Sequence, residues 1–421
     1  HWYPHSFPTR RSSDLSTGSR RSTPGRMRAV SVALVLVGLL LGGGSVMSFL
    51  GTDTALARAD ANAAQLVRLQ EIQTSLVRAD ADVTNGFLVG GLEPVEQQQD
   101  YDDAVATAVR QVTAAARAQP ADGEVLADLA TSIQDYTGTI ALARAANRQA
   151  LPLGAQYLKN ASAGLREDAL PQLAALIAAN ENRVDVEMSA ASTVGTAVVV
   201  LALVGLVGLV LAMVWLARRT HRYVNLPLAT ATVIVTVFLV VAGVALTSAS
   251  STVGSVERGS YATSRALAQA RIAAFDAKAN ESLTLVARGS GAAFEEAWQA
   301  SAATTTAQLS AATSTSSAGV GDGWTQYAAL HEQIRAADDA GDWEGAVALA
   351  VSRAEGSANA AFASFDEASA GALASSGAEV ATSLQGARSG MVGLAVGGGV
   401  VGLLVAALAW RGIGRRIEEY R

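Results

Sequence analysis

The chain has 421 residues, half of which are apolar, and it carries a formal net charge of −6 and no cysteine. The lack of cysteine excludes disulfide-stabilised domains, so packing alone must hold any part outside a membrane. The acidic balance disfavours nucleic acid as a partner, because acidic surfaces repel phosphate. Charged residues avoid four runs, each long enough to cross a bilayer as a helix. These runs are 29–50, 194–217, 226–247 and 390–410.

Residues 1–15 resemble one reading frame of a sequencing-adapter oligonucleotide, so we expect them to be an artefact; a natural basic tail is the alternative. Residues 16–28 are basic and predict a cytoplasmic N-terminus by the positive-inside rule. The first apolar run, 29–50, exceeds the apolar core of a signal peptide, which favours an uncleaved anchor. Its Gly38-x-x-x-Gly42 spacing indicates a close approach by another helix.

The segment 51–193 carries ten basic and 19 acidic residues and shows helical periodicity nearly throughout. Breaks are expected at Gly90, at Pro120 and at 151–154, and a kink is expected at Pro171. Four helices with short connections predict an up-down bundle. The basic flanks of the crossings place this bundle outside the cytoplasm.

The middle of the chain predicts a transmembrane hairpin. The runs 194–217 and 226–247 flank the turn 218–225, which contains three arginines and no acid. The turn is therefore expected in the cytoplasm.

The segment 248–389 repeats the plan of the first half, with eight basic and 15 acidic residues. Its long helix is expected to stop at Gly289, as the first stops at Gly90. These stops lie 199 residues apart, and the crossings that precede them start 197 residues apart. This spacing indicates a tandem duplication.

The end of the second half predicts one further helix. Apolar residues from Val347 to Leu384 suggest a helix, weakened by glycines, that continues into the crossing 390–410. The tail 411–421 is expected in the cytoplasm, with no cytoplasmic domain. The predicted fold is an all-α membrane protein, with four transmembrane helices carrying two extracytoplasmic antiparallel helical bundles.

Few residues suit catalysis. His331, which faces Arg335 on a predicted helix, has no second His or Cys nearby, so we interpret it as a solvated surface residue. We expect no enzyme, no cofactor and no metal site. The crossings contain no ionisable residue, which disfavours a pump or channel.

Two helix segments place Asp and Asn one or two turns before a glycine stop. We interpret them as a polar layer that sets helix register, and a membrane-distal contact surface for a ligand or partner is the alternative. The candidate residues are Asp80, Asn85, Asp276, Asn280 and Glu281.

The basic turn and tail are candidates for a cytoplasmic partner contact, unless their arginines only set topology. The candidate residues are Arg218, Arg219, His221, Arg222, Tyr223, Arg415, Arg416 and Tyr420.

Four stretches resemble a known family, and they are Asp80–Pro94, Leu151–Leu170, Asp276–Gly289 and Arg415–Arg421. With the four crossings, they are similar to actinobacterial signalling proteins of the GlnX type. The resemblance implies a relay from an extracytoplasmic GlnH-type amino-acid-binding protein to the cytosolic serine/threonine protein kinase G. It implies glutamate or aspartate as the sensed signal and no catalytic residues.

We therefore predict a signal relay in the plasma membrane, with both termini cytoplasmic. The alternatives are a direct small-molecule receptor of the chemoreceptor-like helical-bundle class and a structural membrane scaffold. The sequence leaves the oligomeric state open, a homodimer included.

Overall fold

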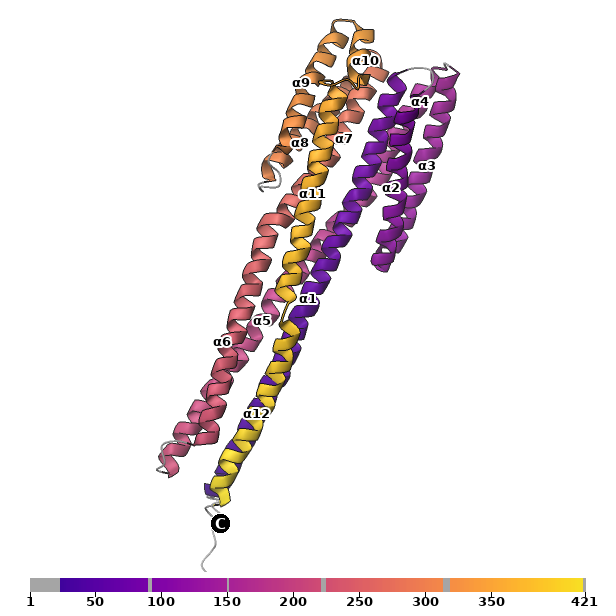
Figure 1. The fold of residues 1–421 in the computed structure, drawn as a ribbon. Helices are drawn as coiled ribbons and strands as arrows, with labels where there is room; N and C mark the ends of the chain where they lie inside the picture. Colours follow the sequence, from indigo (N-terminus) through magenta and orange to yellow (C-terminus); the bar gives the residue numbers. More distant parts are fainter. Residues whose placement is uncertain (1–22, 90–92, 150, 221–224, 313–318, 419–421) are drawn as a thin grey trace, which may run out of the picture. The chain divides into compact units, whose positions relative to one another are not determined.

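The computed structural model contains helices and no strand in the residues that it describes, which confirms the predicted all-α fold (Figure 1). The described residues are 23–89, 93–149, 151–220, 225–312 and 319–418. They divide into two compact units, which we name the apolar unit and the polar unit. The apolar unit is formed by the described residues of His1–Met47, Ala197–Gly243 and Gly393–Arg421, and the polar unit by those of Ser48–Thr196 and Val244–Val392.

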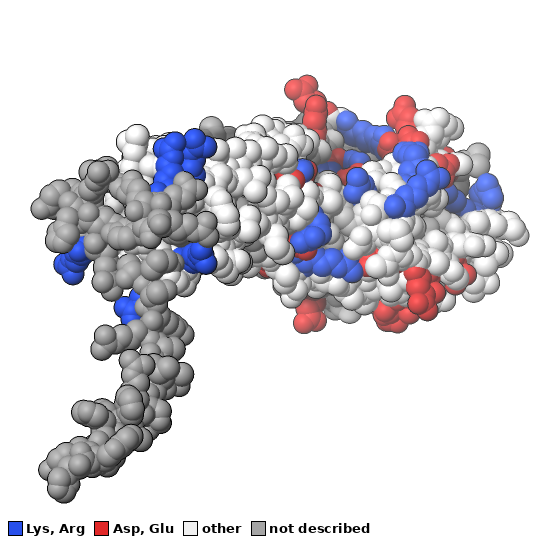
Figure 2. All heavy atoms as spheres, turned by 90° about the horizontal axis from the view of Figure 1, so that it is seen from below, with Lys and Arg blue, Asp and Glu red and all other residues white. Residues whose placement is uncertain are grey.

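The apolar unit consists of parts of four helices, each overlapping a stretch long and apolar enough to cross a membrane. The helices are α1 (Thr23–Leu88), α5 (Leu170–Thr220), α6 (Leu226–Val256) and α12 (Met391–Glu418). Their outer faces carry exposed aliphatic side chains such as Leu40 and Leu211, which suits contact with lipid. In Figure 2 the described surface of this unit is white apart from basic side chains. The chain is a multi-pass membrane protein.

The two glycines Gly38 and Gly42 of α1 lie against α12. A Cβ added at Gly38 would lie 2.8 Å from the backbone nitrogen of Ala406, and one at Gly402 would lie 2.4 Å from the Cα of Gly42. No side chain fits at such separations, so the two backbones contact each other directly. The predicted close approach of a second helix is confirmed.

Gly402→Ala should destabilise the protein by about 1–3 kcal/mol, because its methyl group has no room between α1 and α12. Gly397→Ala is the matched control on the same helix, since a Cβ at Gly397 meets nothing within 4 Å. Thermal unfolding of both variants in one detergent measures the difference. Equal melting temperatures would contradict the direct backbone contact.

The first half of the polar unit follows the predicted order of helices. Breaks occur at the expected places, because α1 ends before Gly90, Pro120 opens a short 3₁₀ turn, and a new helix begins beside Pro152. The elements are α2 (Val95–Ala118), η1 (Pro120–Asp122), α3 (Gly123–Arg148) and α4 (Leu153–Gly164).

A π-helical turn, η2 (Leu165–Ala169), lies just before Pro171, where the sequence predicts a kink. Proline has no N–H to donate, and its ring crowds the carbonyl four residues earlier, here that of Glu167. Glu167 lies within the turn, so the wider π-helical winding relieves the crowding. Helix α4 therefore continues through η2 into α5.

The second half begins with a second π-helical turn, which sequence periodicity does not reveal. The elements are η3 (Glu257–Tyr261), α7 (Ala262–Val286), α8 (Ala292–Ala311) and α9 (Val320–Asp339). Helix α7 stops as predicted before Gly289, which has a φ of +81° that glycine adopts without strain.

The prediction of one unbroken helix after residue 347 is wrong, because two interruptions divide it. A turn containing Gly356, with φ +79°, separates the first two helices, and Gly390, with φ +89°, separates the second from α12. The side chain of Ser357 caps the new helix by accepting a hydrogen bond from the backbone N–H of Ala360. The first two helices are α10 (Trp343–Val351) and α11 (Ala358–Arg388).

Helices α1 and α7 form the centre of the polar unit. One hydrophobic cluster gathers α1 to α5 and includes Leu283 of α7. The other gathers α7 to α11 and includes Val77 and Ala81 of α1. The two predicted bundles thus lie in one compact unit, while the tandem duplication stays a prediction.

Candidate functional site

Arg166 joins α1 to α7 through two ion pairs, an arrangement that we name the Arg166 clamp. Its Nη1 lies 2.8 Å from Oδ2 of Asp80 on α1, and its Nη2 lies 2.8 Å from Oδ1 of Asp276 on α7. Arg166 itself stands on the π-helical turn η2. π-helical turns are rare and often lie at functional positions. One guanidinium therefore connects the first half of the chain to the second.

Asp80 is the buried end of the Arg166 clamp, with a side chain that is 1 % exposed. Its Oδ1 accepts hydrogen bonds from Ser162 Oγ at 2.6 Å and from the hydroxyl of Tyr136 at 3.3 Å. Burial, aided by the charge of Asp80, raises the pKa of Tyr136 well above its usual value, so the hydroxyl remains a donor. A buried carboxylate is tolerated only when paired and hydrogen-bonded, and Asp80 meets both conditions.

Asp276 ends the clamp on α7. The side-chain amide of Asn280, one turn later, donates to Asp276 Oδ2 at 3.1 Å and to its carbonyl at 2.9 Å. Ser301 of α8 donates to the same Oδ2 at 2.7 Å. Burial alone would lower the pKa of Arg166, but the charges of Asp80 and Asp276 raise it above its usual value. Arg166 is therefore charged at neutral pH.

A second clamp of opposite charge joins the same two helices, and we name it the Asp366 clamp. Asp366 on α11 pairs with Arg78 of α1 and, through Oδ1 at 2.7 Å, with Arg271 Nη2 of α7. Arg271 also donates from Nη1 to the carbonyl of Asp366 at 2.7 Å and to Ser369 Oγ at 2.9 Å. One arginine between two aspartates and one aspartate between two arginines thus hold α1 against α7.

Glu281 follows Asp276 in α7 and belongs to a separate buried cluster. Its Oε1 accepts from Lys278 Nζ at 2.7 Å, and its Oε2 lies 2.8 Å from Nδ1 of His331 and 3.1 Å from the hydroxyl of Tyr327. The His331 ring stacks on Trp298, with 3.6 Å between centroids. Burial would raise the pKa of Glu281, but Lys278 and His331 lower it to about 2. The cluster joins α7, α8 and α9.

His331 is not the solvated surface residue that the sequence predicts, because it is only 1 % exposed. Burial would lower its pKa, but the carboxylates of Glu281 and Glu295 raise it above 6.5. Both acids lie many residues away in the chain, so inspection of the neighbouring sequence misses them. The described residues contain no group of three His, Cys, Asp or Glu that could hold a metal ion.

The structure brings together three of the five polar residues singled out in the two helix segments. Asp80, Asp276 and Asn280 meet at the Arg166 clamp, whereas Glu281 lies in its own cluster. Asn85 donates to the carbonyl of Ala350 at 3.2 Å and accepts from Gln97. Asp80, Asn85, Asn280 and Glu281 are buried. Their burial favours the polar-layer interpretation over an open contact surface.

The candidate cytoplasmic contact is described only in part. Arg218 and Arg219 fall in α5 and Arg415 and Arg416 in α12, and the side chains of Arg219 and Arg416 are not described. The candidates outside the described residues are His221, Arg222, Tyr223 and Tyr420.

The end of the turn contacts the last helix within the apolar unit. Asn225 is buried, and its side-chain amide donates to the carbonyl of Gly412 at 3.0 Å. A Cβ at Gly412 would lie 3.0 Å from Asn225 Oδ1 and 3.1 Å from Cβ of Pro227. The start of α6 and the end of α12 therefore pack closely.

Sequence reasoning missed Arg166 and Asp366, the central residues of the clamps. Arg166 falls within the stretch Leu151–Leu170, but nothing local distinguishes it from exposed arginines. The one local signal is Pro171, which disturbs the helix at Arg166. Asp366 has no such signal, because its partners lie in α1 and α7.

Residues 54–189 match the family model of an actinobacterial sensor domain. The match begins in α1 and ends in α5, so it includes Asp80 and Arg166 but stops before Asp276 and Asp366. No curated protein and no solved structure matches the chain. The match supports an actinobacterial sensor protein with a signalling role.

Proposed function

We propose that this protein relays an extracytoplasmic amino-acid signal across the membrane to a cytosolic serine/threonine kinase. In this proposal a solute-binding protein loaded with glutamate or aspartate docks on the polar unit. The kinase docks on the basic turn and the tail of the apolar unit. The sensor-domain match over residues 54–189 supports the signalling role. The relay partners come from the resemblance to the GlnX type and are part of the proposal.

The observation that carries the proposal is the course of α1. This helix runs without a break from Thr23 to Leu88 and contributes residues to both units. Near its end it carries Arg78 and Asp80, which belong to the two clamps. A change at the clamps therefore acts on a helix that also belongs to the apolar unit.

The clamps offer a physical basis for two states. Charged groups that are buried and fully paired exchange partners in discrete steps, because partly paired arrangements are costly. A loaded binding protein shifts the equilibrium between two arrangements only by the difference in its affinity for them. The proposed role is one of binding and conformational change and includes no catalytic step.

Affinity purification of the tagged full-length protein from its native membranes, with and without added glutamate, tests the relay. We expect a solute-binding protein and a serine/threonine kinase among the recovered partners, the former increasing with glutamate. Recovery of neither partner would overturn the proposal. Recovery of the kinase alone would limit the proposal to the contact with the kinase in the cytoplasm.

Replacing Arg218, Arg219 and Arg222 together by Gln should abolish recovery of the kinase while leaving recovery of the binding protein unchanged. The change removes three positive charges from the turn and preserves hydrogen-bonding capacity. Protease protection of tagged termini must first show unchanged topology. Normal kinase recovery by this variant would mean that the arginines only set topology.

A direct small-molecule receptor is the second candidate, because the polar unit contains a charged pocket of about 530 Å³. Pockets of roughly 300–1,000 Å³ are typical of small-molecule sites. Calorimetry on the full-length protein separates the two functions. Saturable binding of a small molecule without any partner protein favours the receptor.

A further inference from the structure

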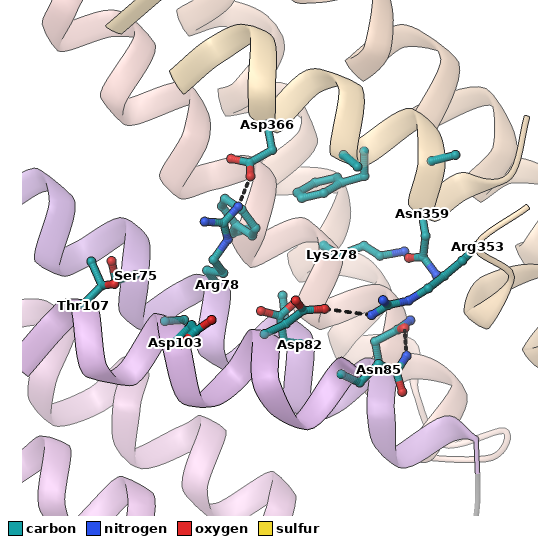
Figure 3. Close-up of a pocket in the computed structure, with 18 of the residues that line it drawn as sticks. Ser75, Arg78, Asp82, Asn85, Asp103, Thr107, Lys278, Arg353, Asn359 and Asp366 are labelled. Atoms are coloured by element: carbon teal, nitrogen blue, oxygen red, sulfur yellow. Dashed lines mark hydrogen bonds and ion pairs between the residues drawn. The ribbon is translucent and has the colours of Figure 1, made fainter. Parts of the chain in front are cut away.

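The pocket of about 530 Å³ lies among α1, α2, α7 and α11 in the polar unit (Figure 3). Its lining contains three basic side chains, those of Arg78, Lys278 and Arg353. Each already has an acidic partner, because Arg78 pairs with Asp366, Lys278 with Glu281 and Arg353 with Asp100. Each positive charge of the pocket is therefore already paired, and Arg78 shares Asp366 with Arg271.

The acidic side chains of the pocket are in excess. Asp82, Glu71 and Asp103 line it, and none of the three has a hydrogen-bond or ion-pair partner among the described residues. Figure 3 shows Asp82 in the middle of the drawn side chains, between Arg78 and Arg353. An anion entering here would meet uncompensated carboxylates, whereas a cation would find partners.

Asp82 is the best placed of these acids to receive a cation. It is half-buried on α1, while Asp103 is exposed. Burial raises the pKa of Asp82 to about 7, against the lowering effect of Arg78 on its own helix, Arg353 after α10 and Lys278 on α7. Asp100 on α2 adds to the rise. A half-buried carboxylate without a partner is stabilised by a charged hydrogen-bond donor.

The apolar part of the lining suits a carbon skeleton. Phe275 and Phe362 are buried and meet edge to face, with 5.0 Å between ring centroids. Aromatic rings favour methylene groups and nearby cations. A bare metal ion fits less well, since no group of three candidate ligands occurs among the described residues.

We propose that this pocket binds a small organic cation, whose primary ammonium group is received by Asp82 and whose carbon chain lies on Phe275 and Phe362. The chemistry is shared by diamines such as putrescine and by basic amino acids such as L-lysine. L-Glutamate, with an extra carboxylate, is disfavoured at this site. The proposal deepens the receptor function and is independent of the relay partners.

Calorimetric titration of the full-length protein in nanodiscs with putrescine, L-lysine and L-glutamate tests the proposal. We expect saturable binding of putrescine or L-lysine and much weaker binding of L-glutamate. Whichever of the two amines binds more strongly shows whether the ligand is a diamine or a basic amino acid. Because binding requires ionised Asp82, affinity should fall as the pH is lowered through about 7. Equal binding of L-glutamate, or no binding of either amine at millimolar concentration, would overturn the proposal.

Asp82→Asn should weaken amine binding at least about tenfold, a loss of about 1.4 kcal/mol, and remove its dependence on pH. Asp168→Asn is the matched control, because Asp168 is exposed and outside the pocket. Asp103→Asn, on the exposed rim, provides a milder variant if Asp82→Asn does not fold. Unchanged affinity in folded Asp82→Asn would overturn the site. Loss of the site would leave the membrane pull-down, and so the relay, unaffected.

Discussion

Replacing Arg166 with Met should lower the free energy of unfolding of the polar unit by about 3 kcal/mol or more. The change leaves Asp80 buried without a counter-charge, and breaking a buried ion pair from one side costs about 3–5 kcal/mol. We place the loss at the lower end because Ser162 and Tyr136 still donate to Asp80. Denaturant unfolding of the full-length protein, followed by circular dichroism, measures the loss.

Arg58→Met is the control for the Arg166 substitution, because Arg58 pairs with Glu187 at an exposed position. It should leave stability close to that of the wild type, since exposed ion pairs contribute little. The double variant Asp80→Asn, Arg166→Met should lose less than Arg166→Met alone, because no buried charge is left unpaired. A loss no larger than that of Arg58→Met would show that the clamp does not stabilise the fold.

Asp366→Asn should also destabilise the protein by about 3 kcal/mol, since it removes the carboxylate that pairs with the buried guanidinium of Arg271. The Arg271 side chain is only 5 % exposed. Its bonds to the carbonyl of residue 366 and to Ser369 survive the change and limit the loss. The same unfolding measurement applies.

Glu367→Gln is the neighbouring control for Asp366→Asn, because Glu367 is exposed on the same helix. It removes one negative charge from α11 without touching the clamp, so it should have little effect. If Asp366→Asn and Glu367→Gln unfolded at the same denaturant concentration, the ion pair between Asp366 and Arg271 would not stabilise the protein.

The order of helices could be predicted from the sequence because the signals for it are local. Residues such as Pro120 and Gly289 favour helix ends through local backbone preferences, because proline lacks an N–H and glycine adopts positive φ without strain. The same reasoning failed after residue 347. Gly356 and Gly390 do interrupt the chain there, but other glycines in this region remain inside helices, and the sequence does not distinguish them.

The candidate site could be predicted only in part. Asp80 and Asp276 stood out because each precedes a glycine stop at a similar distance. Their common partner Arg166 depends on which faces of α1, η2 and α7 meet, and tertiary packing decides that. His331 was misjudged for the same reason, because its partner Glu281 is 50 residues away in the chain.

The two clamps also limit how α1 and α7 can move past each other. At about 100° per residue, Arg78 and Asp80 project about 200° apart around α1, and Arg271 and Asp276 about 140° apart around α7. Rotating α1 about its axis by the angle of one residue, or sliding it along α7, would break the ion pairs of both clamps at the same time. The motion that preserves every pair moves α1, α7, η2 and α11 together as a rigid body. A signal in this protein is therefore expected either to displace that body as a whole or to exchange the partners of both clamps in one step.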